Sequence, residues 1–439
     1  LHPDLPDEDC EALLRQMREC LEGRGGEISA RARAAALGQC YLGLNDTGRK
    51  RFLELLAGQF AVDRQALYAA AREIHEIDNL EHALKTEARL REILTPPRLN
   101  LLTQFNSLPE GVKFLVDLRE DLMRYSQGNP LLQSLDDDLR ALLTSWFDVG
   151  FLELTRITWD APAALLEKLI AYEAVHEIRS WDDLKHRLSP DRRCYAFFHP
   201  RMPDEPLIFI EVALVSGMAN SIQALLDQHM PTEDPRNMDT AIFYSISNTQ
   251  KGLKGVNFGS FLVKRVVDRL VKELAGLKTF ATLSPIPGFR RYLETVLPGR
   301  EGELLSQAER KALAGVFAAD STKGNVRDLL TAPDWSRDKR VAQTLKGPLT
   351  RFCAFYLAHE RRNGRALDRV AHFHLSNGAR IERINWLADV SPKGMRHSAG
   401  LMVNYRYKLR DIEGNHEAYS SSGEAAASPS VRRLLRSVD

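Results

Sequence analysis

The sequence lacks the features of several large classes of protein. Its five cysteines are scattered, odd in number and never spaced as in a CxxC pair, so we expect neither a disulfide framework nor a metal site, and such usage is typical of a reducing compartment. No apolar run is long enough to cross a bilayer, and the acidic opening stretch lacks a signal-peptide core. With 60 basic against 59 acidic side chains, the chain also lacks the basic excess of a general nucleic-acid binder. We expect a cytoplasmic protein with no membrane or nucleic-acid partner.

The N-terminal part has the apolar periodicity of helices almost throughout. Apolar side chains recur three and four positions apart, and glycines and prolines separate the periodic segments. Few polar side chains cluster there in a way that suggests chemistry. We predict a helical bundle over residues 1–150 that serves packing and self-association. Its helices are expected at residues 10–21, 28–42, 47–60, 64–94, 98–105, 111–125 and 130–147.

The composition changes near Gly150, and residues 151–439 mix strands with shorter helices. This part is predicted to be an α+β domain, with a helical insertion at about residues 301–360 and a polar tail after the last strand. Within the insertion, helices are expected at 306–317, 325–331, 339–345 and 349–358. The strands are expected at residues 151–159, 194–199, 206–215, 241–247, 277–283, 370–375, 381–387 and 401–407.

One stretch, residues 241–290, organises this second part. Its pattern predicts a buried strand, a glycine-containing loop, an amphipathic helix from Ser260 and a second strand. A glycine loop that leads into a helix N-terminus is suited to bind an anion, because free N–H groups and the helix dipole face it. The glycine spacing fits neither a P-loop nor a dinucleotide fingerprint. Taken alone, the pattern also fits a strand–helix–strand unit that serves only packing.

Two further positions could carry chemistry. Prolines and a glycine follow Ser284 directly, which predicts a tight turn that holds an exposed serine at a strand end. His374 is expected on a strand, on the same face as His372, just before a hairpin turn at Asn377-Gly378. By itself, a histidine on a strand is more often structural than catalytic.

Several segments, in this order and spacing, resemble malonyl-CoA decarboxylase. The likeness covers most of the chain, is weakest near the N-terminus, and also includes GVKFLVDLRxDL, SxWFDVGFLxLxRITW, RRCYAFFH and PLIFIEVAL. Its most specific segments are FYSISNTQKGLKGVNFGSFLVKRVV, LSPIPGF, FHLSNGA, RINWLADVS and GLMVNYRY.

The resemblance implies a helical oligomerisation domain followed by a catalytic domain similar to the GNAT fold of N-acetyltransferases. It also implies a carboxy-lyase of fatty acid metabolism that converts malonyl-CoA to acetyl-CoA and CO₂, as a homodimer or homotetramer. Carried over residue by residue, the catalytic serine and histidine fall on Ser284 and His374. The coenzyme A loop falls on Lys254, Gly255, Val256, Asn257, Phe258, Gly259 and Ser260. Possible supporting residues are Ser245, Asn248, Asn377, Asn404, Tyr405 and Tyr407.

The chemistry of the implied reaction suggests roles for these groups. A malonyl thioester carries its own electron sink, so we expect no cofactor beyond the coenzyme A of the substrate. His374 is expected to protonate the enolate carbon, because an ordinary histidine pKa suits proton donation near neutral pH. Ser284 would orient the malonyl carboxylate or bond to His374, and backbone N–H groups within 245–248 would stabilise the enolate oxygen.

Two other functions stay open at this point. A coenzyme A-dependent acyltransferase of the GNAT type would share the glycine loop but need a base and a pocket for an acceptor amine. A catalytically silent protein could use the same fold to sense acyl-CoA, although the presence of both Ser284 and His374 argues against it.

Overall fold

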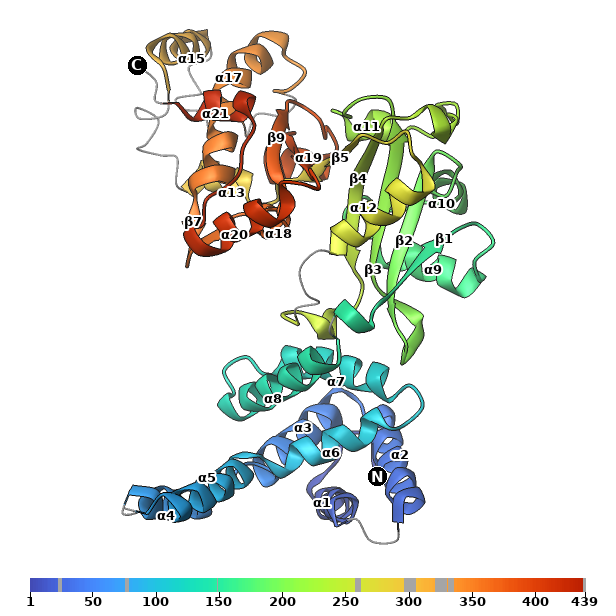
Figure 1. Cartoon of the computed structure of the whole chain (residues 1–439), viewed down its shortest axis with the longest axis vertical. Coiled ribbons are helices and arrows are strands. Elements are labelled where there is room, and N and C mark those ends of the chain that lie inside the picture. Colours follow the sequence, from blue (N-terminus) through green and yellow to red (C-terminus); the bar gives the residue numbers. More distant parts are fainter. Residues whose placement is uncertain are drawn as a thin grey trace. The chain divides into compact units, whose positions relative to one another are not determined.

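The computed structural model (Figure 1) describes residues 1–22, 26–75, 79–147, 149–256, 262–295, 305–319, 330 and 335–436. The chain divides into two compact units. The first, here the helical unit, comprises Leu1–Glu153, Phe198–Leu207 and Gln250–Phe258; the second, the sheet unit, comprises Leu154–Phe197, Ile208–Thr249 and Gly259–Asp439. The sequence predicts a single domain boundary near residue 150. The two short segments from later in the chain that belong to the helical unit are not part of that prediction.

The helical unit packs its helices around a core of leucines such as Leu53, Leu115 and Leu135, which are fully buried. The expected helix over 64–94 is two helices, because Asn79 begins the second by accepting a hydrogen bond from the Glu81 N–H. These two helices, α4 and α5, pack against each other (Figure 1). The helices are α1 Asp7–Leu21, α2 Gly26–Gly43, α3 Asp46–Gln59, α4 Arg64–His75, α5 Leu80–Leu94, α6 Pro97–Asn106, α7 Gly111–Tyr125 and α8 Pro130–Trp146.

The start of the predicted glycine loop lies in the helical unit. It forms a short 3₁₀ turn, η3 (Lys251–Leu253), against α7. A Cβ on Gly252 would come within 1.8 Å of the Val116 carbonyl oxygen. Gly252 therefore allows close packing on a helix. Gly255 has a left-handed φ of +80°, which favours glycine.

The sheet unit is built on a mixed sheet in the order β1-β2-β3-β4-β5-β10-β6, with β9 paired to β10. β4 and β5 run parallel and are joined through α12, Leu262–Glu273; the strand pairs β3–β4, β5–β10, β6–β10 and β9–β10 are antiparallel. The predicted fold class, a helical part followed by an α+β domain, is thus confirmed. The strands are β1 Glu153–Ile157, β2 Arg192–His199, β3 Met202–Val215, β4 Thr240–Asn248, β5 Thr279–Thr282, β6 Ser284–Pro285, β9 Arg380–Asn385 and β10 Met402–Arg406.

A bulge in β4 shapes the middle of this sheet. Ser245 pairs with Glu211 of β3 and Phe243 with Val212, so Tyr244 is the extra residue. The pairing of β4 with β5 covers Thr240 to Phe243 and stops there. The rest of β4 therefore keeps its β3 partner while its other edge is free of β5.

Several expectations for the second part are wrong. Residues 370–375 form a helix, α18 (Arg369–Ser376), because the Asp368 carboxylate accepts hydrogen bonds from two N–H groups at its start. Asn377-Gly378 is accordingly not a hairpin turn: Asn377 ends the helix and Gly378 follows with a φ of +79°.

The C-terminal segments also differ from the prediction. The polar tail folds as α20 (Ile412–Ser422) and α21 (Pro429–Leu435), and the two helices expected at 339–358 are one helix, α17 (Lys339–His359), that continues through Pro348. Of the helix expected at 325–331, only Leu330 is among the described residues. The remaining elements are η1 Val149–Phe151, α9 Ala163–Tyr172, α10 Trp181–Arg187, α11 Ile222–Leu225, η2 Pro235–Asn237, α13 Phe289–Thr295, α15 Gln307–Ala319, β7 Arg361–Arg362, β8 Arg365–Ala366 and α19 Pro392–Ser398.

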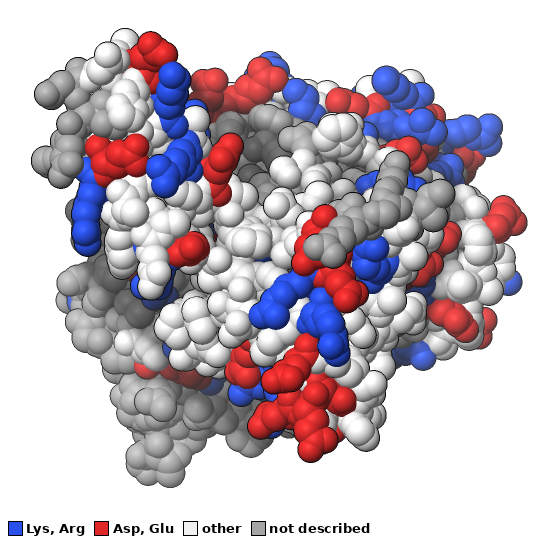
Figure 2. All heavy atoms as spheres, turned by 90° about the horizontal axis from the view of Figure 1, so that it is seen from below, with Lys and Arg blue, Asp and Glu red and all other residues white. Residues whose placement is uncertain are grey.

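The charged side chains of the surface are mixed in sign. Figure 2 shows Lys and Arg interspersed with Asp and Glu on the face it presents, with uncharged areas between them. This matches the formal net charge of +1. Among the described residues, no helix is both long and apolar enough to span a membrane.

Candidate active site

A pocket of about 420 Å³ in the sheet unit contains both residues predicted to be catalytic. Its wall includes Tyr244, the bulged residue of β4, and Ile246, Ser247 and Asn248 beyond it. Ser284 comes from β6 and His374 from α18. The segment 174–176 also lines the pocket, and the helix α19 contributes Lys393, Gly394, His397 and Ser398.

Ser284, His374 and Tyr407 form a hydrogen-bonded row. The Ser284 hydroxyl oxygen lies 3.1 Å from His374 Nε2, and the Tyr407 hydroxyl lies 2.8 Å from His374 Nδ1. Ser284 donates its own hydrogen to the Thr282 hydroxyl at 2.8 Å. This sets a consistent direction: Nε2 carries a hydrogen that it donates to Ser284, and Tyr407 donates to Nδ1.

Burial sets the charge of this row. His374 is buried, and burial lowers the pKa of His374 to about 3. Burial likewise raises the pKa of Tyr407 above its ordinary value. The imidazole is therefore neutral at neutral pH, and the expectation of an ordinary histidine pKa is wrong. Ser284 is also buried, so the expectation of an exposed serine is wrong as well.

The other supporting residues have separate roles. The Tyr405 ring stacks on His374 with centroids 4.6 Å apart. Asn404 is fully buried and donates to the carbonyl oxygens of Ala219 and Thr282, which is a structural role beside the row. Asn377 donates to the Phe373 carbonyl at the end of α18 and does not line the pocket. The Ser245 hydroxyl donates to the Glu173 carboxylate.

Comparison with known proteins identifies the family. Residues 150–439 match the profile described as malonyl-CoA decarboxylase C-terminal domain, and residues 60–147 match the profile described as malonyl-CoA decarboxylase N-terminal domain. The chain belongs to the malonyl-CoA decarboxylase family. The mitochondrial malonyl-CoA decarboxylases of Anser anser anser and Rattus norvegicus are 39% and 40% identical to it, over 92% and 93% of this chain and 83% and 87% of theirs.

Solved structures of the malonyl-CoA decarboxylase family are similar over nearly the whole chain. The enzyme from Rhodopseudomonas palustris superposes with a TM-score of 0.87 at 43% identity and covers 97% of this chain and 99% of its own. That from Agrobacterium vitis has a TM-score of 0.86 at 42% identity, with 98% and 100% covered. The resemblance found in the sequence is confirmed.

The predicted coenzyme A loop is described only at its start. Lys254, Gly255 and Val256 belong to the helical unit, whereas residues 257–260 lie outside the described residues. The buried guanidinium of Arg119 donates to the carbonyl oxygens of Gly252 and Lys254, at 2.6 and 2.9 Å, and pairs with Asp136 of α8. The helical unit thus fixes the backbone that leads into this loop.

Sequence reasoning missed several residues near the pocket. Thr282 lies two positions before Ser284, and this spacing could have placed the two side chains on one face. Glu173 and Lys393 gave no such signal, because their partners lie far away in the sequence. In the part of the chain that is described, no group of three or more His, Cys, Asp and Glu side chains is placed to hold a metal ion.

Proposed function

We propose that this chain is a carboxy-lyase that converts malonyl-CoA to acetyl-CoA and CO₂ in the pocket of the sheet unit. The observation that carries this proposal is the 3.1 Å contact between Ser284 and His374, in a chain that belongs to the malonyl-CoA decarboxylase family. A hydroxyl and a neutral imidazole at one pocket wall can supply a proton.

The thioester carbonyl of the substrate accepts the electron pair released when the C–C bond to the carboxylate breaks. No further cofactor is then needed, because the thioester carbonyl is itself the electron sink and becomes an enolate. Its oxygen requires hydrogen-bond donors that are already in place. We assign this role to backbone N–H groups within residues 245–248, where β4 is free of β5 and lines the pocket.

The enolate carbon takes its proton from the row of hydrogen bonds. In our scheme the Ser284 hydroxyl turns its hydrogen from Thr282 to the carbon. It gives up this hydrogen and receives the Nε2 hydrogen of His374 in the same step. Tyr407 stabilises the histidine by donating to Nδ1, and a proton from solvent restores the imidazole. The net change consumes one proton and releases one CO₂ for each acetyl-CoA formed. Ser284 is thus a proton carrier in this scheme.

The coenzyme A moiety is assigned to the loop 254–260 and the start of α12. Support comes from the amphipathic helix that follows the loop and from the close packing and hydrogen bonds that fix the loop's first residues. The N-terminus of a helix favours the negative charge of a pyrophosphate. The cationic side chain of Lys254 adds to this preference.

The experiment that tests the function is an assay of malonyl-CoA with the purified chain, without added cofactor and with a chelator present. We expect equal amounts of CO₂ and acetyl-CoA. Absence of CO₂ release, with transfer of an acetyl group from acetyl-CoA to an added amine, would instead establish a GNAT-type acyltransferase.

Assembly and location are further parts of the proposal. We assign residues 1–150 to self-association as a homodimer or homotetramer, with residues 151–439 as the catalytic domain and 301–360 as an insertion. The support is the series of amphipathic helices in the helical unit. Sedimentation at a mass of one chain would contradict this. A cytoplasmic location and a role in fatty acid metabolism remain predictions, testable by cell fractionation and by lipid analysis of a deletion strain.

A further inference from the structure

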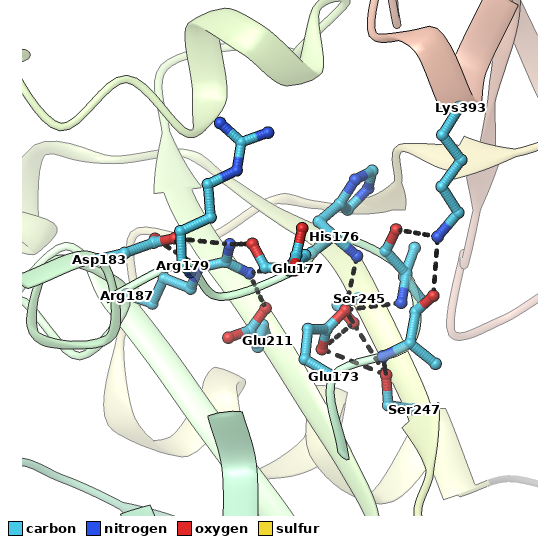
Figure 3. Close-up of polar contacts among 12 residues, drawn as sticks. Glu173, His176, Glu177, Arg179, Asp183, Arg187, Glu211, Ser245, Ser247 and Lys393 are labelled. Atoms are coloured by element: carbon cyan, nitrogen blue, oxygen red, sulfur yellow. Dashed lines mark hydrogen bonds and ion pairs between the residues drawn. The ribbon is translucent and has the colours of Figure 1, made fainter. Parts of the chain in front are cut away.

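The carboxylate of Glu173, just after α9, collects hydrogen bonds from two directions (Figure 3). From β4, the Ser245 hydroxyl lies 2.9 and 2.8 Å from its two oxygens, and the Ser247 hydroxyl lies 3.2 Å from Oε2. From its own segment, the N–H groups of Val175 and His176 donate to Oε1 at 2.8 and 2.7 Å. Glu173 thus ties β4 to the segment 174–176, and both line the pocket.

The charge of Glu173 fixes the direction of these bonds. A carboxylate has no hydrogen to give, so both serine hydroxyls donate in their contacts with it. The 3.3 Å contact between the two serine oxygens then uses neither hydrogen. A hydroxyl has one hydrogen and two lone pairs, and the Ser247 oxygen already accepts from the Ala174 N–H at 3.4 Å. Because Ser247 lines the pocket, its remaining lone pair makes it an acceptor, and not a donor, toward a bound molecule.

The segment that Glu173 holds is fixed on its other sides too. Lys393 Nζ donates to the carbonyl oxygens of Ala174 and Val175, at 2.9 and 2.8 Å (Figure 3). Arg187, which is buried between Asp183 and Glu211, donates to the carbonyl oxygens of His176 and Glu177 at 2.8 and 3.0 Å. Charged side chains therefore hold the backbone carbonyls along this irregular segment, which makes it a rigid wall.

We propose that Glu173 is a positioning residue that keeps the Ser247 oxygen as an acceptor for an amide N–H of the pantetheine arm of coenzyme A. This rests on the proposed function for the identity of the ligand. The malonyl carboxylate and the thioester carbonyl are acceptors, so neither can bond to an acceptor-only hydroxyl. Amide N–H groups are the donors of the arm that lie closest to the thioester.

The test is the variant Glu173→Gln, which keeps the shape and changes one oxygen to NH₂. Oε1 receives two backbone N–H groups, so the amide oxygen stays there and the NH₂ faces the serines. Ser247 must then accept from Gln as well as from the Ala174 N–H, so both of its lone pairs are used and none is left for the amide N–H. Its own hydrogen turns toward the pocket or toward the Ser245 oxygen 3.3 Å away. We expect about tenfold weaker binding of coenzyme A by calorimetry and an equal rise in KM for malonyl-CoA.

The kcat should stay within about threefold of the wild type, because this contact is the same in the ground and transition states. Glu177→Gln is the matched control: it makes the same change of charge at an exposed residue of the same segment, and coenzyme A binding should be unchanged. Ser247→Ala should also weaken coenzyme A binding, and the double variant Glu173→Gln, Ser247→Ala should be no weaker than Glu173→Gln alone.

Unchanged coenzyme A binding in Ser247→Ala would overturn the inference, even if Glu173→Gln fails to fold. Additive effects in the double variant would also overturn it, because Glu173 would then act independently of Ser247. The binding measurement does not require turnover. Weaker coenzyme A binding in a chain that releases no CO₂ would therefore contradict the proposed function while supporting the role of Glu173.

Discussion

His374 Nε2 lies 3.1 Å from the Ser284 hydroxyl oxygen, although the two residues are 90 positions apart in the chain. A helix supplies the histidine, and a short strand at the edge of the sheet supplies the serine. The contact is buried, so it is shielded from water and the imidazole stays neutral. A neutral N–H and a hydroxyl are adequate acids here, because a thioester enolate is a strong base.

Tyr407 is expected to act through His374. In Tyr407→Phe the ring remains but Nδ1 loses its 2.8 Å partner, so the imidazole is no longer held in the tautomer with hydrogen on Nε2. We expect kcat to fall by about 10–100-fold, the usual loss when a partner that orients a functional histidine through its other ring nitrogen is removed. Coenzyme A affinity should not change. A kcat equal to that of the wild type would show that the tautomer is set by something else.

The buried histidines predict how stability depends on pH. Burial lowers the pKa of His374 to about 3 and that of His176 to about 4, from an ordinary value of 6.5. Above pH 6.5 these two imidazole rings are neutral in both the folded and the unfolded state. Below it, the unfolded chain takes up protons that the folded chain does not, so the free energy of unfolding falls as the pH is lowered.

This effect can be measured by urea unfolding between pH 6.5 and 5, where most carboxylates remain ionised. The free energy of unfolding should fall more steeply with decreasing pH in the wild type than in His374→Gln. The difference in slope should be up to about 1.4 kcal/mol per pH unit, the value for one proton. Equal slopes for the two proteins would mean that the folded state also protonates His374 in this range.

Gly252 is expected to tolerate no side chain. Its added Cβ would lie 1.8 Å from a backbone oxygen of α7, so Gly252→Ala should destabilise the helical unit by about 1–3 kcal/mol and weaken coenzyme A binding by moving the residues that follow. Gly58→Ala is the control: no atom lies within 4 Å of a Cβ there, within α3, and it should stabilise by about 0.5–1 kcal/mol. A stable Gly252→Ala variant would contradict the close packing.

Local signals explain which parts of the fold could be predicted. The apolar β-branched run at 241–247 predicted β4, which spans Thr240–Asn248. The alternation of apolar and histidine side chains over residues 370–375 favours a strand, whereas the capping Asp368 favours the helix α18 that forms. When a short segment fits both a helix and a strand pattern, its capping residue and its packing decide which of the two forms.

The site was predictable where it rests on family motifs and not where it rests on distant contacts. Ser284 and His374 follow from the segments LSPIPGF and FHLSNGA. Glu173 could not be found in this way, because Ser245 lies 72 positions along the chain and only the folded sheet brings them together. The low pKa of His374 has the same origin, since burial cannot be read from neighbouring residues.

The most direct test of the account is the rate of CO₂ release by Ser284→Ala and His374→Ala, measured beside coenzyme A binding in the same preparations. If the pair delivers the proton to the enolate, kcat should fall by about 10²–10⁴-fold in each variant while coenzyme A still binds. Turnover at the wild-type rate in either variant would contradict the assignment and place the proton donor elsewhere in the pocket.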